Sequence, residues 1–255
     1  MKTLKTKLFL ALLSIMVTGI LHAQEKTTQA YWVHEDVVRP AMVAEYENIC
    51  KELTDNMKKH NIQEVDVIVS NTADSRYLWV SKIESMADIE KPVFATLAEK
   101  MGGTAMSDLF DRMDKCYDIE HNYIIHLDKE LSYMPDGLTQ TPEGQNYRKF
   151  HYLHYTPGDR AMIKEKMKAI RAMFVEKGSK THYRVYKSGF GTRGEFFMVA
   201  VAAKDAIDYA TKASANDKAL GEDGDKTMGD LFGNLLKYEE FVGRMRPDMA
   251  YSPSN

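Results

Sequence analysis

The chain has 255 residues, of which 44% are hydrophobic, 34 are Lys or Arg and 37 are Asp or Glu. A net charge of −3 argues against nucleic acid and anionic membrane surfaces as partners, because both attract basic proteins. This length and hydrophobic content suit one large domain or two small ones.

The first 23 residues have the pattern of a cleavable signal peptide. Three lysines open the chain, an apolar run covers residues 8–21, and the small residue Ala23 follows. This run is shorter than the roughly 20 residues that a bilayer span needs. We therefore expect a mature chain from Gln24, periplasmic or secreted, with 31 basic against 37 acidic residues and no stable membrane insertion. An uncleaved N-terminal anchor is the alternative.

The next hundred residues predict the element order β-α-β-β-α-β. Strands are expected at 30–35, 65–70, 77–83 and 121–127, with a turn at 71–74. A second helical region is expected over 87–117, broken near Gly102 and Gly103. The first helix is indicated by apolar side chains at helical spacing: Met42, Tyr46, Ile49, Cys50, Leu53 and Met57.

The last hundred residues predict the same order. Strands are expected at 149–155, 181–187, 195–202 and 240–246. One helix covers 161–176 and stops at Gly178, and a second helical region over 206–237 is interrupted at 221–224. A polar, partly irregular linker over 128–147 separates the two parts, because it carries two prolines and two glycines.

Three patterns recur in the same order at a nearly constant offset. This indicates a tandem duplication with repeats at 28–135 and 146–253. The matched patterns are His34-x6-Ala41-Met42-x2-Glu45 with His154-x6-Ala161-Met162-x2-Glu165, Met106-x-Asp108-Leu109-Phe110 with Met228-x-Asp230-Leu231-Phe232, and Tyr133-x-Pro135 with Tyr251-x-Pro253.

The element order of each repeat is that of a ferredoxin-like unit, an α+β fold. Tyr77 and Trp79 face one side of their strand while Leu78 and Val80 face the other, so both faces of the sheet need cover. In this the chain resembles the dimeric α+β barrel superfamily. The resemblance implies two ferredoxin-like units packed sheet to sheet as a pseudo-dimeric barrel. That group includes cofactor-free monooxygenases, haem-degrading enzymes and haem-binding chlorite dismutases, but no motif of any of them is matched, so the cofactor stays open.

Two matched aromatic–histidine pairs are the candidate ligand-binding residues. Strand alternation puts Trp32 with His34, and Tyr152 with His154, on one face of each strand. If these faces line the barrel interior, two imidazoles and two aromatic rings meet in one cavity. Two alternatives stay open: the opposite faces form the interior, or each histidine bonds to a neighbouring helix as a structural residue.

The sequence offers further, weaker candidates for functional residues or motifs. Asp108 and Asp230 match between the repeats as acid–base candidates, or as helix caps or solvent-facing residues. The glycine-rich segment 189–194 joins two strands and is read as a hairpin loop rather than a phosphate cradle. Cys50 and Cys116 replace apolar residues of the other repeat, which favours buried free thiols over a disulfide. No metal site is indicated.

These observations favour an exported protein that binds a small apolar or aromatic ligand in its barrel. One alternative is a structural or interaction protein with a filled barrel. Another is an oxygenase-like or haem-dependent enzyme, which the resemblance alone implies. Whether the protein is an enzyme, and whether it forms an oligomer, the sequence leaves open.

Overall fold

The computed structural model describes residues 27–254, so the predicted signal peptide lies outside the described residues. Its strands are β1 (Thr28–Val38), β2 (Ile68–Thr72), β3 (Arg76–Ile83), β4 (Tyr117–Tyr133), β5 (Tyr147–Tyr155), β6 (Tyr183–Ser188), β7 (Glu195–Ala203) and β8 (Lys237–Met245). Its α-helices are α2 (Val43–His60), α3 (Ala95–Met101), α4 (Gly103–Met113), α5 (Arg160–Glu176) and α6 (Ala206–Phe232). Short 3-10 helices cover Pro40–Met42, Met86–Asp88, Asp114–Cys116 and Pro157–Asp159.

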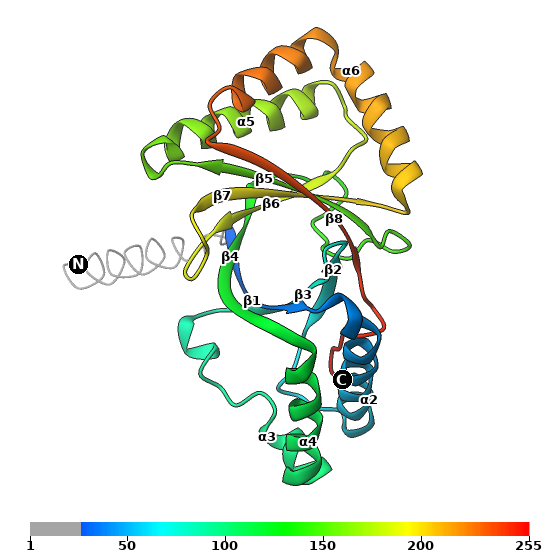
Figure 1. Ribbon diagram of the computed structural model, residues 1–255. Coiled ribbons are helices and arrows are strands. Elements are labelled where there is room, and N and C mark those ends of the chain that lie inside the picture. Colours follow the sequence, from blue (N-terminus) through cyan, green and yellow to red (C-terminus); the bar gives the residue numbers. More distant parts are fainter. Residues whose placement is uncertain (1–26, 255) are drawn as a thin grey trace, which may run out of the picture.

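The eight strands close into one antiparallel barrel in the order β1-β3-β2-β8-β5-β7-β6-β4 (Figure 1). The first four strands are therefore arranged β4-β1-β3-β2 and the last four β8-β5-β7-β6, which is the same relative order. Two seams join these halves, one between β2 and β8 and the other between β4 and β6. Closure leaves no unpaired edge strand in the sheet.

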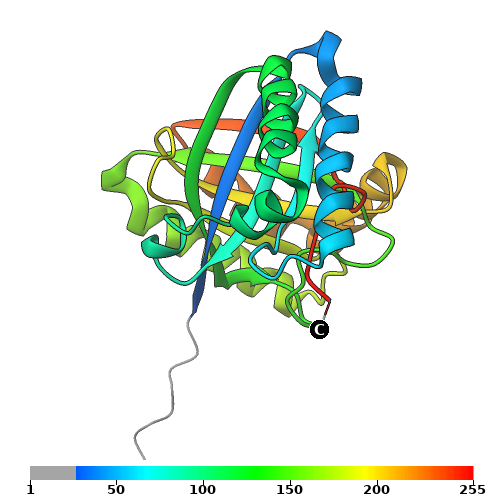
Figure 2. The same ribbon diagram turned by 90° about the horizontal axis from the view of Figure 1, so that it is seen from below.

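Helices cover the barrel on two opposite sides (Figure 1). Helices α2, α3 and α4 lie along the strands of the first half, as Figure 2 also shows, and α5 and α6 lie over the second half. Each helical layer has its own apolar core against the outer face of the sheet, and a third core fills the inside of the barrel. β3 thus needs cover on both faces, as its sequence pattern predicted, whereas β8 is largely polar and exposed.

Particular residues mark several helix ends and breaks. Asp205 caps α6, because its Oδ1 accepts a hydrogen bond of 2.8 Å from the backbone N–H of Asp208. Helix α2 ends at Asn61, which adopts the left-handed conformation with φ of 45°. The predicted break at Gly102 is present, with φ of 87°, and the predicted interruption of the last helix is a kink at Gly221.

Three predicted boundaries are wrong. The predicted linker at 128–147 begins too early, because β4 continues to Tyr133 with Leu131 and Tyr133 buried against the second half. The strand predicted at 65–70 begins only at Ile68; Val67 instead forms an isolated bridge with Tyr251 near the C-terminus. The helical region predicted at 87–117 has a second interruption, between the 3-10 helix Met86–Asp88 and α3, and it stops at Cys116 because Tyr117 begins β4.

Within residues 27–254, none of the helices combines the length and the apolar content that a bilayer crossing requires.

Candidate functional site

Trp32 and His34 lie on the outer face of β1. The Trp32 indole Nε1 donates to Asn122 Oδ1 at 3.0 Å, and His34 Nδ1 lies 3.0 Å from the same oxygen. His34 Nε2 lies 3.1 Å from Asp36 Oδ1, and Asp36 accepts a bond from the Tyr46 hydroxyl on α2. Burial alone would lower the pKa of His34, but the bonds to Asp36 and Asn122 raise it on balance. His34 is thus tied into the first helical layer.

Tyr152 and His154 lie on the inner face of β5. Tyr152 packs in the barrel interior against the rings of Phe196 and Phe241. His154 Nε2 lies 2.9 Å from Glu239 Oε2 on β8.

The predicted meeting of the four side chains is therefore wrong. On β1 the interior side chain is Val33, whereas on β5 it is Tyr152, so the aromatic–histidine pairs face opposite sides of the sheet. Because side chains alternate between the two faces of a strand, a shift of one residue between the two strands is enough to move a pair to the opposite face. Whether any of these four residues binds a ligand stays a prediction.

The other candidates are structural or solvent-facing. Asp108 is exposed on α4, and Asp230 is exposed on α6, where it forms an ion pair of 2.5 Å with Lys166. Cys50 and Cys116 are free buried thiols in the first helical core. Burial raises the pKa of both, as expected for unreactive thiols.

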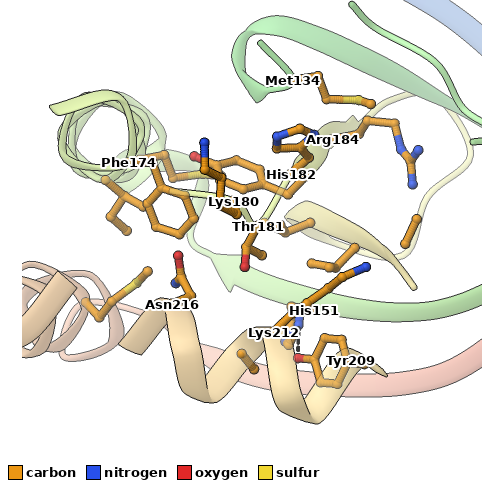
Figure 3. A pocket seen from close by; sticks show the side chains of 18 of the residues that line it. Met134, His151, Phe174, Lys180, Thr181, His182, Arg184, Tyr209, Lys212 and Asn216 are labelled. Carbon is orange, nitrogen blue, oxygen red and sulfur yellow. Dashed lines mark hydrogen bonds between the residues drawn. The ribbon is translucent and has the colours of Figure 1, made fainter. Parts of the chain in front are cut away.

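The barrel interior is too full for the ring-sized ligand that the sequence led us to expect there. The apolar residues that point inward leave a cavity of about 70 Å³. A much larger cavity of about 570 Å³ lies outside the barrel, between the second-half sheet and helices α5 and α6. Residues 134–145 of the linker form part of its rim (Figure 3).

This cavity exists because the inner face of α6 carries small and polar residues. Tyr209, Ala213 and Asn216 recur at helical spacing on the face turned to the sheet, where large apolar residues would complete a core. The opposite wall is apolar. It is formed by Met167, Ile170, Phe174, Val199 and Val201, while Met228 adds an apolar side chain from the C-terminal part of α6. Polar and charged side chains also border the space, among them Lys180, His182 and Lys212. A concave space with an apolar wall and polar groups at defined places is typical of a small-molecule site.

His151 is the central polar group on the wall. It projects from the outer face of β5, and its Nε2 lies 3.3 Å from the hydroxyl of Tyr209 (Figure 3). Its Nδ1 lies 2.7 Å from the hydroxyl of Tyr238, which itself donates to Glu240 Oε2 at 3.1 Å. Since the Tyr238 proton is directed to Glu240, Nδ1–H donates to Tyr238, and Nε2 accepts from Tyr209. A hydrogen-bonded chain thus runs from the cavity to a surface carboxylate.

Burial lowers the pKa of His151 to about 4, because the nearby Glu240 carboxylate does not compensate for the lost hydration. The imidazole is therefore neutral near pH 7. Burial also raises the pKa values of Tyr209 and Tyr238, so both phenols keep their protons. The chain contains a neutral acceptor between two hydroxyl groups, an arrangement that can pass a proton from one end to the other.

The donors on this wall do not fit haem or another metal group. Haem iron needs an axial side chain with an available lone pair, and both ring nitrogens of His151 are hydrogen-bonded to tyrosines. The other histidine on the wall, His182, has its Nε2 3.9 Å from Asp136. Among residues 27–254, no cluster of three or more His, Cys, Asp or Glu side chains could hold a metal ion.

Comparison with known proteins supports the fold. No family model matches the chain, and no curated protein matches it. Among solved structures, an anthrone oxidase-like protein aligns with a TM-score of 0.58 at 12% identity, covering 88% of this chain and 93% of its own. A protein named "putative monooxygenase" from Lactobacillus acidophilus aligns with a TM-score of 0.51 at 7% identity. The alignment covers 86% of this chain and 94% of that protein's chain. A protein of the same name from Fusobacterium nucleatum aligns with a TM-score of 0.52 at 11% identity, and the alignment covers 87% of this chain and 94% of that protein's chain.

These likenesses confirm the predicted dimeric α+β barrel fold for this chain. At such low identities they concern the fold alone, and the activities named belong to those proteins. The sequence pattern did not single out Tyr209 or Tyr238, and His151 lies on the face of its strand opposite to the predicted pair Tyr152 and His154. These three residues come from three separate elements and form no local motif.

Proposed function

We propose that the protein binds a small, mainly apolar ring molecule that carries an oxygen atom, in the cavity between the second-half sheet and helices α5 and α6. The observation that carries this proposal is the 570 Å³ cavity itself, with its apolar wall on the sheet and α5 and with the hydrogen-bonded pair Tyr209 and His151 beside it. The rings would pack on Phe174 and Met167, and the oxygen would meet the Tyr209 hydroxyl.

Anthrone, a three-ring ketone, is a suitable probe, since a fold neighbour is described as anthrone oxidase-like. Filling the cavity with Ala213→Phe should weaken anthrone binding by about tenfold or more, a loss of at least ~1.4 kcal/mol. Ala215→Phe is the matched control, because Ala215 is on the same helix, exposed, and not part of the cavity wall. Binding is measured by calorimetry. Equal anthrone affinities in both variants and the wild type would contradict the proposal, because the ligand would then not occupy this cavity.

A second candidate function is oxygenase-type chemistry on the bound molecule. The hydrogen-bonded chain favours it, because a substrate hydroxyl next to Tyr209 could lose its proton through His151 and Tyr238 to Glu240. In anthrone this hydroxyl is that of the enol form. The resulting enolate would react with dioxygen as the co-reactant: one oxygen atom becomes a new ring carbonyl at the former CH2 carbon, and the other leaves as water with the two hydrogens lost. The neighbours named as monooxygenases support this reading by fold only.

Oxygen consumption in the presence of anthrone tests this second function. We expect His151→Phe to reduce turnover at least tenfold while anthrone affinity changes little, and Tyr209→Phe to reduce turnover by as much and also to weaken binding, because it removes the partner of the ligand oxygen. Tyr147→Phe is the control, since Tyr147 packs against the Tyr209 ring and lies outside the cavity wall. Unchanged oxygen consumption in the two site variants would exclude the chain from catalysis. No consumption by the wild type would leave binding alone.

The predicted signal peptide supports a further proposal, that the chain is exported and matures near Gln24. N-terminal sequencing of protein recovered from outside the cytoplasm tests it. An N-terminus at Met1 would contradict cleavage.

We also propose that the two halves arose by duplication of one ferredoxin-like unit. The three matched patterns and the common strand order of the halves support this proposal. An experimental structure in which residues 28–135 and 146–253 fail to superpose element by element would argue against it.

A further inference from the structure

Two buried arginines point into the barrel interior beneath the linker. Arg148 on β5 is 1% exposed and Arg184 on β6 is 2% exposed. They oppose Ala202 and Ala200 of the strand β7 that lies between them, so small side chains separate the two positions. Both line the interior cavity of about 70 Å³, and Arg184 also borders the larger cavity proposed above for the ligand.

Their hydrogen-bond partners are neutral groups: backbone carbonyls and, for Arg184, also the Tyr186 side chain. Arg148 donates to the carbonyls of Gln145, Tyr147 and Gln140. Arg184 Nη1 donates to the carbonyls of Thr139 and Gln140, at 2.8 and 3.2 Å. The buried Arg184 Nε has no hydrogen-bond partner within residues 27–254.

No carboxylate of the described chain compensates these two charges. The interior carboxylate Glu35 is bound by the Tyr123 hydroxyl at 3.0 Å and lies 3.9 Å from Arg76, its own cation. Burial, and then the nearby Arg184, lower the pKa of Arg148 to about 9. Two guanidinium groups removed from water beside each other, without an acid, are unfavourable unless a negative charge joins them.

We propose that Arg148 and Arg184 together bind a small monovalent anion inside the barrel. The buried Arg184 Nε has no partner in the described chain and is left as a donor for it, and Tyr186 lines the same cavity. A water molecule needs roughly 10–15 Å³ of such space, so a cavity of about 70 Å³ accepts an anion of a few heavy atoms. Chloride, nitrate and formate are of this size, whereas gluconate is too large.

Thermal unfolding in chloride against gluconate, at equal ionic strength, tests the proposal. We expect the wild-type melting temperature to rise with chloride in a saturable manner relative to gluconate, because an anion that binds only the folded state stabilises it. Arg184→Gln should abolish this difference between the salts. Arg193→Gln, in the exposed loop between β6 and β7, should retain it.

The difference between salts separates this role from a purely structural one. If the arginines only hold the linker carbonyls, Arg184→Gln lowers the melting temperature equally in both salts and the wild type shows no preference for chloride; that result overturns the proposal. A second measurement needs no variant. Crystals of the wild type soaked in bromide should show an anomalous peak between the two guanidinium groups, and its absence there would also overturn the proposal.

Discussion

His151 makes the stability of the fold depend on pH. Its pKa is about 4 in the folded protein against about 6.5 in an unfolded chain, so the unfolded chain takes up the proton first as the pH falls. The stabilisation is present above pH 6.5 and is lost between pH 6.5 and 4. For such a shift, the free energy of unfolding should fall by about 2 kcal/mol between pH 7 and pH 5.

Urea unfolding of wild type and His151→Gln at these two pH values measures this contribution. The variant should lose about 2 kcal/mol less than the wild type on acidification. His34→Gln is a control of opposite sign. The pKa of His34 is raised, so His34 stabilises the fold below pH 6.5 and loses this effect as the pH rises. His34→Gln should therefore deepen the acid loss. Identical pH dependence in all three proteins would refute the assignment.

The sequence predicted which strands hold the candidate residues but not which way the side chains point. The repeat pattern aligned His34 with His154, and alternation then placed both on one face. In the structure Val33 and Tyr152 are the inward residues, because packing against the helices sets the phase of each strand separately. A pattern of period two cannot specify this phase when both faces are apolar.

At the scale of elements, the loop between β6 and β7 depends on two glycines with positive φ that differ in their surroundings. The loop folds back onto β4, where the Phe190 carbonyl accepts from Ile124 N–H at 2.8 Å and the Gly191 carbonyl lies 2.9 Å from His121 Nε2. Gly191 has φ of 83°, and a Cβ there would lie 2.6 Å from the Asn122 carbonyl oxygen. Gly194 has φ of 79° but open space around it.

This pair separates conformational strain from steric clash. Gly194→Ala should cost about 1–2 kcal/mol for the left-handed conformation alone. Gly191→Ala should cost about 1–3 kcal/mol more, because the backbone of β4 must move. Chemical denaturation of both variants measures the difference. Equal losses would mean that the loop does not pack on β4 as described.

The order of the elements followed from the sequence, because apolar periodicity and glycine breaks are local signals. The cavity could not be predicted in this way, because it depends on the absence of large apolar side chains from one face of α6. Tyr209, Ala213 and Asn216 occupy an inward face where a full core would need larger apolar side chains. Only the packing of α6 on the sheet shows that this face turns inward, and sequence periodicity alone does not locate an unfilled space.

At the scale of the whole molecule, each half completes the core of the other. Leu131 and Tyr133, at the end of β4, are buried in the second helical core. Met249 and Tyr251, which follow β8, are buried in the first. The Tyr133 hydroxyl donates to the carbonyl of Ser179, just beyond α5. The Tyr251 hydroxyl likewise donates to the carbonyl of Ile62, just beyond α2.

This exchange, with the two strand seams, predicts that the halves unfold together. The chain offers a direct test because its two tryptophans, Trp32 and Trp79, both lie in the first half. Ile163 is fully buried in the core of the second half, so Ile163→Ala should cost about 2–5 kcal/mol through the cavity that it leaves. If the barrel is one cooperative unit, tryptophan fluorescence should report this loss although it observes only the first half.

Urea unfolding followed by fluorescence and by far-ultraviolet circular dichroism provides the measurement. Both signals should shift together in Ile163→Ala, and also in Ile49→Ala, which leaves a cavity in the first core. A fluorescence transition that stays at the wild-type midpoint in Ile163→Ala, while the dichroism divides into two steps, would show that the halves unfold independently. We expect a single transition, because separating the halves would expose the cores that β4 and the C-terminal segment complete, and would also break the hydrogen bonds of both seams.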